Sequence, residues 1–530
     1  MPELSSQTLK LIQKYQYWYQ SLQPREGATT IHVDEVASRV AAFYEKIREI
    51  VDWREEHLMR KAAIERNLKR RLLLRKNGED LATPLVLELI RGGHFPNDKI
   101  EESKISDVQK VIDKYIFILE KSPEPSIEKL KFQLYDWILG IAACEIEEIL
   151  DPPDKENALI EYMYEIMKEK IKISPLIKIS NEEKETQIYI AVQKALFKFD
   201  IPLIQYNLLK KNYPEWKNLP ISLLEEIANN IYQIWENFEK AINNHLAEKF
   251  YKICEKNDTS FLILNDVISS DPKNINKILE NPELFESHIK NAYEKRLKVL
   301  KERLGRAALY STLSIFITKV LLALAIEVPF DKYVTGDFSY FSLGLNAIIP
   351  PMLMFLIVLS IKPPKKENLQ MVIMEVMKIV YKSEKKDTYE IKTRSKRGNV
   401  LNFIINLFYL AAFVVSFGLI VWVLKKLEFG ILSIIIFLIF VSLISFAGMR
   451  IRERSKELDM LEEKENMTAL FFDIFALPII RVGKWLSGQW AKYNVIIVFM
   501  NFLIDMPFQV FVEFLEQWRY FLQEKKEEIH

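Results

Sequence analysis

The residue types that could do chemistry in this sequence lie inside its apolar segments. Lys319 falls near the middle of the apolar segment 307–330, whose only other charged residue is Glu327. A lysine at mid-bilayer depth is too far from either membrane surface for its side chain to reach water, so it needs a partner within the protein. The position of Lys319 therefore predicts a buried polar site.

Two consecutive prolines, Pro350 and Pro351, fall in the middle of the next apolar segment. Proline has no N–H and its ring clashes with the carbonyl four residues earlier, so this pair frees the carbonyls of Asn346 and Ala347. The ammonium of Lys319 has three donors and no acceptor. We therefore expect Lys319 to lie inside the bundle, facing this segment, and to donate to the freed carbonyls, with the Asn346 amide beside it.

Three interpretations of this polar seam are open. In the first, Lys319, Asn346 and the prolines tie two transmembrane helices together, as polar contacts in membranes commonly do. In the second, a broken helix beside an ionisable group marks the path of an ion or a proton. In the third, Lys319 faces a subunit interface or a water-filled cavity. Asn402 and Asn406, one helical turn apart in a later apolar segment, are predicted to extend the same seam.

A basic stretch in the first part of the chain, residues 54–76, is a second candidate binding surface. Such a helix can neutralise the phosphates of anionic lipid or nucleic acid, or it can present a solvated face on which Glu and Arg pair. Aromatic residues for base stacking are missing from the stretch, so nucleic acid is the least favoured partner. The basic side chains of this surface are Arg60, Lys61, Arg66, Lys69, Arg70, Arg71 and Arg75.

Patterns that mark catalysis, metal binding or cofactor binding do not occur in the sequence. The histidines are scattered without an HExxH, and there is no glycine-rich phosphate loop, GxSxG elbow or kinase motif set. Cys144 and Cys254 form no CxxC pair and no disulfide framework, which suits a reducing compartment. The sequence therefore predicts no catalytic, cofactor-binding or metal-binding residue, and a protein that is not an enzyme.

The elements that must position these residues are predicted to be helices, in an all-α fold. Leu, Ile, Phe and Tyr recur at spacings of three and four, without the sustained alternation typical of strands. Charged residues crowd into residues 1–305, which we interpret as a cytoplasmic helical bundle with a candidate sub-boundary near 122–126. Clusters of Pro, Gly, Asn and Asp are expected to end helices here, among them SPEPS, DPPD, NDTS and SSDPKN.

A coiled-coil-like seam is predicted on one long helix over residues 33–77. The pattern falters before Arg54, so we expect the helix to pack inside the bundle rather than to form a free coiled coil. The apolar residues that form the seam, at a 4-3-4-3 spacing, are Val36, Val40, Phe43, Ile47 and Ile50.

Four transmembrane helices are predicted within residues 306–449. Each apolar segment has about 20 residues, the number that a helix needs to cross a bilayer core about 30 Å thick. The basic loop 362–398 and the arginines after the fourth segment place the N-terminal domain, the loop and the C-terminal flank in the cytoplasm, where Lys and Arg are retained. The predicted spans are 307–330, 338–361, 399–424 and 429–449.

Residues 450–530 are predicted to form a charged helix followed by amphipathic helices. Their Trp, Tyr, Lys and Arg content suits helices that lie in the headgroup layer, are re-entrant, or pack on the bundle. The longest uncharged apolar run, 493–504, is short for a span, and Asp505 would be costly at depth. A fifth span over 493–512 is the open alternative.

Two functions from different classes fit this organisation. We expect an integral membrane scaffold or adaptor without enzymatic activity, whose cytoplasmic helical domain binds a partner, because more than half of the chain is charged and helical. The alternative is an oligomeric channel or transporter that uses Lys319 and the helix broken at Pro350 and Pro351. The partners that the sequence suggests are the lipid bilayer, a cytoplasmic protein, anionic lipid headgroups and further copies of the chain.

Overall fold

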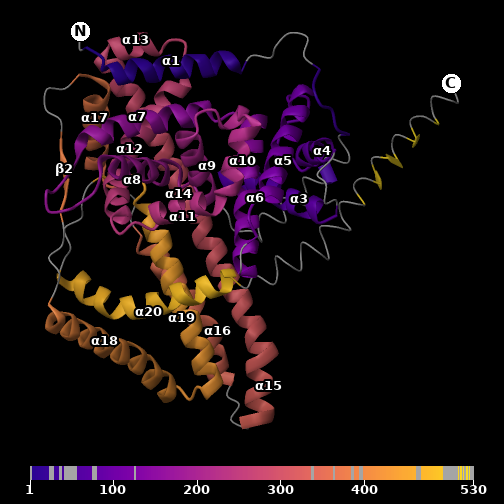
Figure 1. The fold of residues 1–530 in the computed structure, drawn as a ribbon. Coiled ribbons are helices and arrows are strands. Elements are labelled where there is room, and N and C mark those ends of the chain that lie inside the picture. Colours follow the sequence, from indigo (N-terminus) through magenta and orange to yellow (C-terminus); the bar gives the residue numbers. More distant parts are fainter. Residues whose placement is uncertain are drawn as a thin grey trace.

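The structure is a computed structural model of the 530-residue chain. Among the described residues, the regular elements are helices apart from two three-residue strands, which confirms the all-α prediction. A globular helical part lies at one end, and long apolar helices extend from it (Figure 1). The structure describes residues 3–22, 29–34, 39–40, 56–74, 80–124, 127–335, 340–361, 364–382, 387–392, 398–460 and 467–492, with a few positions between 511 and 525.

The first hydrophobic core of the globular part is formed by helices within residues 56–242. Apolar residues at helical spacing provide their inner faces; in α4, Leu85, Val86 and Leu89 are all fully buried. The helices are α3 (Glu56–Leu74), α4 (Ala82–Arg91), α5 (Ser103–Lys121), α6 (Glu128–Leu150), α9 (Ile201–Asn212), η1 (Trp216–Asn218), α10 (Ile221–Asn229) and α11 (Ile231–Ile242). Because α5 and α6 both belong to this core, the cores do not divide near 122–126.

A second core lies beside the first and gathers segments from distant parts of the chain. Tyr189 and Phe199 pack against both cores, which joins them. The helices of the second core are α1 (Ser6–Ser21), α7 (Asp154–Lys170), α8 (Asn181–Phe197), α12 (Ala247–Ser270), α13 (Ile275–Glu280), the first half of α14 (Pro282–Leu322) and α17 (Lys366–Val380).

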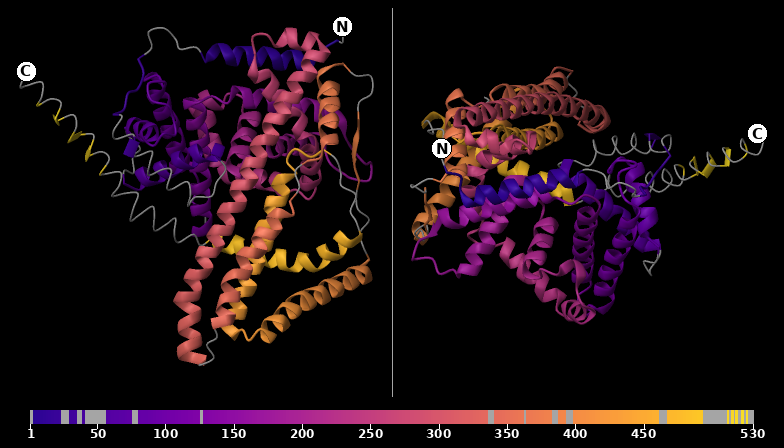
Figure 2. Two further views of the ribbon diagram at one scale, coloured as in Figure 1. Left: turned by 180° about the vertical axis from the view of Figure 1, so that it is seen from behind. Right: turned by 90° about the horizontal axis from the view of Figure 1, so that it is seen from above.

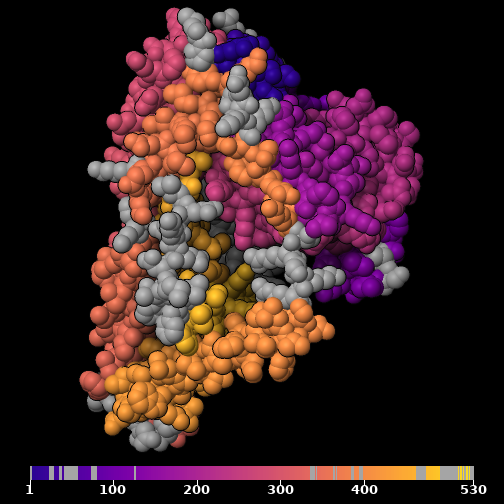
Figure 3. Space-filling model, turned by 90° about the vertical axis from the view of Figure 1, so that its left-hand side faces the viewer, coloured from indigo at the N-terminus to yellow at the C-terminus, as the bar shows by residue number. Residues whose placement is uncertain are grey.

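The segment predicted as a basic cytoplasmic loop, 362–398, forms part of this second core. α17 buries Val372 and Val376 there, and β2 (Tyr389–Ile391) pairs in parallel with β1 (Ile171–Ile173). In the space-filling view, the orange surface that follows the first apolar helices lies against the purple surface of the globular part (Figure 3). The apolar residues of α17 cover only one narrow face. Because the rest of the segment is rich in charge, the sequence did not indicate that α17 is part of a core.

The NDTS stretch was predicted to end a helix, but it lies inside α12. Its side chains find partners in other segments: Tyr389 OH donates to Asn257 Oδ1, and Thr259 Oγ1 donates to the carbonyl of Glu457, both at 2.9 Å. These contacts hold the two side chains in the folded domain, although the Asn257 amide also donates to the carbonyl of Ile253 one turn earlier in α12. The other three stretches do separate helices, as predicted.

Most of the predicted coiled-coil-like seam lies outside the described residues. Val36, Phe43, Ile47 and Ile50 are not among them, and α3 begins at Glu56. The seam over residues 33–77 therefore stays a prediction.

Among the described residues, three helices are long and apolar enough to cross a membrane: Pro282–Val334, α18 (Asn399–Lys426) and α19 (Ile431–Ser455). The first starts in the second core as α14 and passes without a break into its apolar half, as predicted. It continues through the π-helical segment η2 (Ala323–Glu327), α15 (Val328–Phe330) and a second π-helical segment, η3 (Asp331–Thr335). It is the long rod that runs from the globular part to the far end of the molecule (Figure 2).

Within the described part of the chain, the prediction of four spans is therefore corrected to three candidate spans. The second predicted span, 338–361, contains α16 (Tyr340–Leu359), whose apolar described part, Leu343–Leu359, is shorter than 18 residues. At 1.5 Å per residue this part is about 25 Å long, less than a bilayer core of about 30 Å. The preceding helix extends to Thr335, beyond its predicted end at residue 330.

α20 (Met467–Lys492) packs across α19 and α18, whose axes diverge from their shared turn (Figure 1). At the crossing, a Cβ on Gly483 of α20 would overlap the carbonyl oxygen of Ser442 of α19. Gly448 of α19 makes a similar close approach to Ile357 of α16, where a Cβ would lie 2.5 Å from the side chain. Glycine thus lets these helices approach as small residues do in membrane bundles.

α20 belongs to the region predicted to hold amphipathic helices, and it packs on the bundle. It is not among the described helices that are long and apolar enough to span a membrane. Residues 493–510, which contain most of the alternative fifth span, lie outside the described residues. Of the charged helix predicted after residue 450, residues 450–455 are the end of α19, and residues 461–466 lie outside the described residues.

Candidate functional site: a buried ion pair among the apolar helices

Lys319 and Glu327 form an ion pair buried among the apolar helices. Lys319 Nζ donates to Glu327 Oε1 at 2.5 Å, and neither side chain is exposed. The ammonium also lies 5.3 Å from the ring centre of Phe440 on α19, within reach of a cation–π contact. The two opposite charges cancel in surroundings where a single charge would be costly.

Asn346 and Ser433 bind the second carboxylate oxygen of Glu327. Asn346 Nδ2 of α16 donates to Glu327 Oε2, and Ser433 Oγ of α19 lies 3.2 Å from the same oxygen. Ser433 Oγ also lies 3.4 Å from Asp331 Oδ2. The carboxylate of Glu327 therefore has partners on α14, α16 and α19, and the cluster ties these three helices together.

The π-helical segment η2 explains how Lys319 and Glu327 meet. In a regular α-helix, a separation of eight residues overshoots two full turns by about 80°. The wider π-helix turns less per residue, so η2, which ends at Glu327, brings its side chain back to the face of Lys319. A local departure from α-helical geometry therefore builds the site.

Lys319 donates to a carboxylate rather than to the carbonyls that the prolines free, so its predicted partner is corrected. α16 continues as one helix through Pro350 and Pro351, which are both buried, so the predicted broken helix is not found in this part of the described chain. Asn346 does join Lys319 in one cluster, as expected. The missed residue, Glu327, had a signal in the sequence, since it is the only other charge of segment 307–330.

Asn402 and Asn406 do not extend this cluster. Both lie on α18, are exposed, and make no hydrogen bond through their side chains to a described residue. Their predicted place in the seam is corrected, because α18 diverges from the helices that carry Lys319 and Asn346 (Figure 1).

The basic stretch 54–76 is largely paired within the protein rather than open as a surface. Lys61 is 1% exposed and pairs with Asp200. Glu88 of α4 binds Arg70 Nη2 at 2.6 Å and Arg71 Nη2 at 2.7 Å. The further pairs are Arg60 with Asp151, and Lys69 with Glu65 and Asp136.

These pairs correct the predicted basic surface. Arg66 is half-buried, and Arg75 lies outside the described residues. Most of the partner carboxylates come from α4, α6 and the start of α9, far from the stretch in sequence, so a count of charges along the stretch could not reveal them. The positive charge is mostly neutralised inside the domain.

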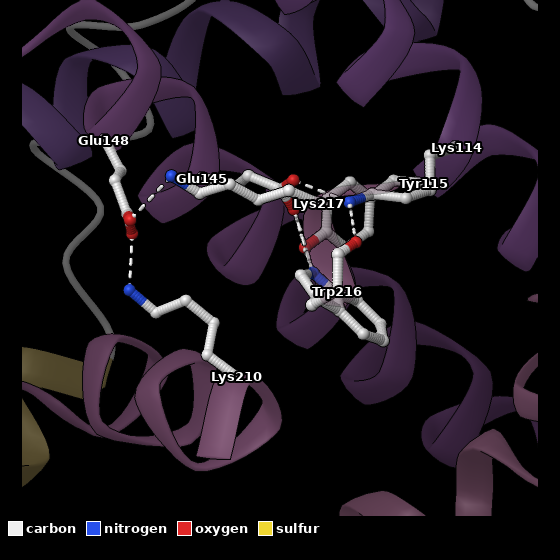
Figure 4. A network of polar contacts seen from close by, with 7 residues as sticks. All are labelled: Lys114, Tyr115, Glu145, Glu148, Lys210, Trp216 and Lys217. Atoms are coloured by element: carbon white, nitrogen blue, oxygen red, sulfur yellow. Dashed lines mark hydrogen bonds and ion pairs between the residues drawn. The ribbon is translucent and has the colours of Figure 1, made fainter. Parts of the chain in front are cut away.

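Glu145 is the centre of a second buried polar network, in the first core (Figure 4). It is 1% exposed and accepts from Lys114 Nζ at 2.6 Å, Tyr115 OH at 2.8 Å and Trp216 Nε1 at 2.9 Å. Burial lowers the pKa of Lys114 although Glu145 opposes the shift, and burial together with Glu145 raises the pKa of Tyr115 well above its usual value.

Glu148, one turn further along α6, pairs with Lys210 at 2.5 Å and Lys217 at 3.0 Å (Figure 4). The two carboxylates thereby join α5, α6, α9 and η1. Protein groups already bind Glu145 through both of its oxygens, so we interpret this network as structural.

The two thiols are unsuited to nucleophilic chemistry. Burial raises the pKa of Cys144 well above its usual value and also raises that of Cys254, so both stay as buried neutral thiols at physiological pH. Among the described residues, no group of three or more His, Cys, Asp or Glu side chains is arranged to hold a metal ion.

Comparison with known proteins gives no further indication of function. No protein-family model, curated protein or solved structure matches the chain at a significant level.

Proposed function

We propose that the chain is an integral membrane protein and a scaffold without enzymatic activity, which holds its helical domain in a fixed position at the cytoplasmic face of the membrane. In this proposal the apolar helices anchor the protein in the bilayer, and the domain binds a cytoplasmic protein. The pairing of the basic stretch 54–76 with carboxylates of the same domain favours a protein partner over anionic lipid headgroups.

The junction at Asn368 is the main support for this proposal. Asn368 is fully buried near the start of α17, where its amide donates to the carbonyl of Leu458 at 2.5 Å and to Tyr293 OH at 3.0 Å. Its Oδ1 accepts from the backbone N–H of Met460 at 2.8 Å. The side chain of Asn368 thus contacts two segments. One is the part of α14 that precedes its apolar half, and the other is the chain that follows α19.

This junction favours a rigid anchor over a flexible tether. The globular part is connected to the apolar helices through the continuous α14, through α17 after α16, and through residues 456–460 after α19. Three connections that share one packed core restrict rotation of the domain against the bilayer, because packed interiors transmit strain.

An oligomeric channel or transporter is the second candidate, and one observation favours it. Asn346 Oδ1 is buried at the Lys319–Glu327 cluster without a hydrogen-bond partner among the described residues. A buried acceptor of this kind suits a water or a transported cation. The neutral ion pair and the continuous α16 make this candidate the weaker one.

Cysteine labelling tests the proposed topology. In a Cys144→Ala/Cys254→Ala background, a single cysteine at Ser180, the exposed N-cap residue of α8, should react with a membrane-impermeant reagent only after cells are permeabilised. A cysteine at Tyr333, which is 79% exposed at the far end of the first apolar helix, should react in intact cells. The reverse pattern would overturn the proposed orientation.

Spin-label distances test the fixed position of the domain. Labels at Lys252 of α12 and Arg450 of α19, both exposed, should give one narrow distance distribution in lipid nanodiscs. Asn368→Leu should broaden it. A broad distribution in the unmodified chain would contradict the rigid anchor.

Vesicle flux separates the two candidates. Full-length protein in liposomes with a pH-sensitive dye inside should pass protons and sodium no faster than protein-free liposomes. A flux that Lys319→Met abolishes would replace the scaffold with the transporter.

A further inference from the structure

Asn402 and Asn406 place two amide side chains on the outside of α18. They lie one turn apart on the same side of the helix, since four residues return nearly to the same face. In the proposed membrane setting, lipid chains offer an amide no hydrogen-bond partner, so exposed amides on a spanning helix favour a protein partner.

The part of α18 around these amides is exposed. Residues 399–408 are all exposed, and only Ala412, Ser416 and Leu424 are buried in the whole helix. α19, which has a similar length, has ten buried residues. α18 is attached to the bundle at its turn with α19 and through α20, where Ser416 Oγ donates to the carbonyl of Phe475 at 2.9 Å.

We propose that α18 binds α18 of a second copy of this chain, with Asn402 and Asn406 hydrogen-bonded across the interface. This inference goes beyond the scaffold function, because it assigns a surface for self-association. Residues 399–408 of α18 are exposed, and α18 diverges from α19 away from their shared turn (Figure 1).

The amides themselves favour a second copy as the occupant. A carboxamide carries two donors and one acceptor, so it is complementary to an identical carboxamide. A two-fold axis brings the same patch of both copies together, and two amides one turn apart then provide two pairs of hydrogen bonds in one contact. Phe403, Ile405 and Leu410 flank the amides with exposed apolar surface that can pack around them.

Disulfide trapping tests the interface directly. Full-length protein with Cys144→Ala and Cys254→Ala receives one new cysteine, Asn406→Cys or Phe408→Cys, and is oxidised in native membranes. Phe408 is 73% exposed at nearly the same depth on the opposite side of α18, so it is the matched control. Dimers should form at position 406 and be rare at 408. Equal trapping at both positions, or none at 406, would overturn the proposal.

Dilution in lipid tests the role of the amides. Labelled protein in liposomes of increasing lipid content should show a monomer–dimer equilibrium by single-molecule photobleaching. Asn402→Leu/Asn406→Leu should weaken dimerisation by about tenfold, as expected for the loss of two modest hydrogen-bonded contacts in a membrane. The variant places apolar side chains at two exposed positions, so it should leave the fold intact. A monomer at every dilution, or a dimer that the variant leaves unchanged, would overturn the interface.

Discussion

The ammonium of Lys319 and the carboxylate of Glu327 lie 2.5 Å apart, and neither side chain has exposed surface. Each is the main counter-charge of the other, since Asn346 and Ser433 contribute only neutral groups. Removal of one charge should therefore cost much more than removal of both.

Lys319→Met should destabilise the protein by about 3–5 kcal/mol, because it strands a buried carboxylate. The double variant Lys319→Met/Glu327→Gln should lose much less stability, since neither buried charge remains. Thermal unfolding of the three proteins in detergent measures the difference. Equal stability of the single and double variants would show that the pair is not coupled, and Pro350→Ala/Pro351→Ala should not rescue Lys319→Met.

Asn368→Leu should open the junction between α17 and the chain after α19. It removes the acceptor for Met460 N–H and the donor for the carbonyl of Leu458, at about 1–3 kcal/mol for each buried group left unpaired. Hydrogen exchange at the Met460 amide should accelerate strongly. Asn368→Asp, which keeps the acceptor, should protect that amide better than Leu does, and equal exchange in both variants would argue against the proposed contact.

Gly483→Ala should displace α20 from α19. The added Cβ overlaps a backbone oxygen of Ser442, which cannot rotate away, so overpacking of about 1–3 kcal/mol is expected. Gly488→Ala is the control in the same helix, because a Cβ there meets nothing within 4 Å. Thermal unfolding should separate the variants, and similar midpoints would contradict the close crossing.

Asp258 should make the stability of the globular part pH-dependent. Burial raises its pKa from 3.8 to about 8, although the ammonium of Lys198 opposes the shift. The folded state therefore binds more protons than the unfolded state between these values, so the stabilisation is complete below about pH 4 and is lost as the pH rises through 8.

Asp258 should make the free energy of unfolding change by at most about 1.4 kcal/mol per pH unit, and Asp258→Asn should lack this dependence. The free energy of unfolding, measured from pH 5 to 9, should increase for the variant relative to the unmodified chain as the pH rises. Glu248→Gln, an exposed change on the same helix, is the control. Parallel curves for Asp258→Asn and the unmodified chain would contradict the raised pKa.

Local patterns predicted much of the fold and half of the central cluster. The spacing of apolar residues indicated the helices and the passage of α14 into its apolar half, since both depend on neighbours within a few turns. The cost of a buried charge indicated that Lys319 would lie inside with a partner, and Asn346 does belong to the cluster.

Partners that are far apart in the sequence could not be predicted in the same way. Glu88 neutralises Arg70 and Arg71 only because α4 folds against α3. Glu327 reaches Lys319 only because a π-helical segment shifts its direction, and no propensity rule indicates where such a segment occurs. The role of α17 in the second core likewise depends on contacts with helices more than a hundred residues away.

The contact between α1 and the end of α17 has a consequence for the order of events during synthesis. Thr8 of α1 donates to the carbonyl of Val380, 372 residues later, and Ser5 N–H donates to the same carbonyl. The ribosome must therefore make α14 and α16 before α1 has its final partner. The N-terminal part therefore waits, without its full set of contacts, until the first apolar helices have been made. Leu11, Ile12 and Tyr15, which are buried in the finished core, need protection from aggregation during that interval.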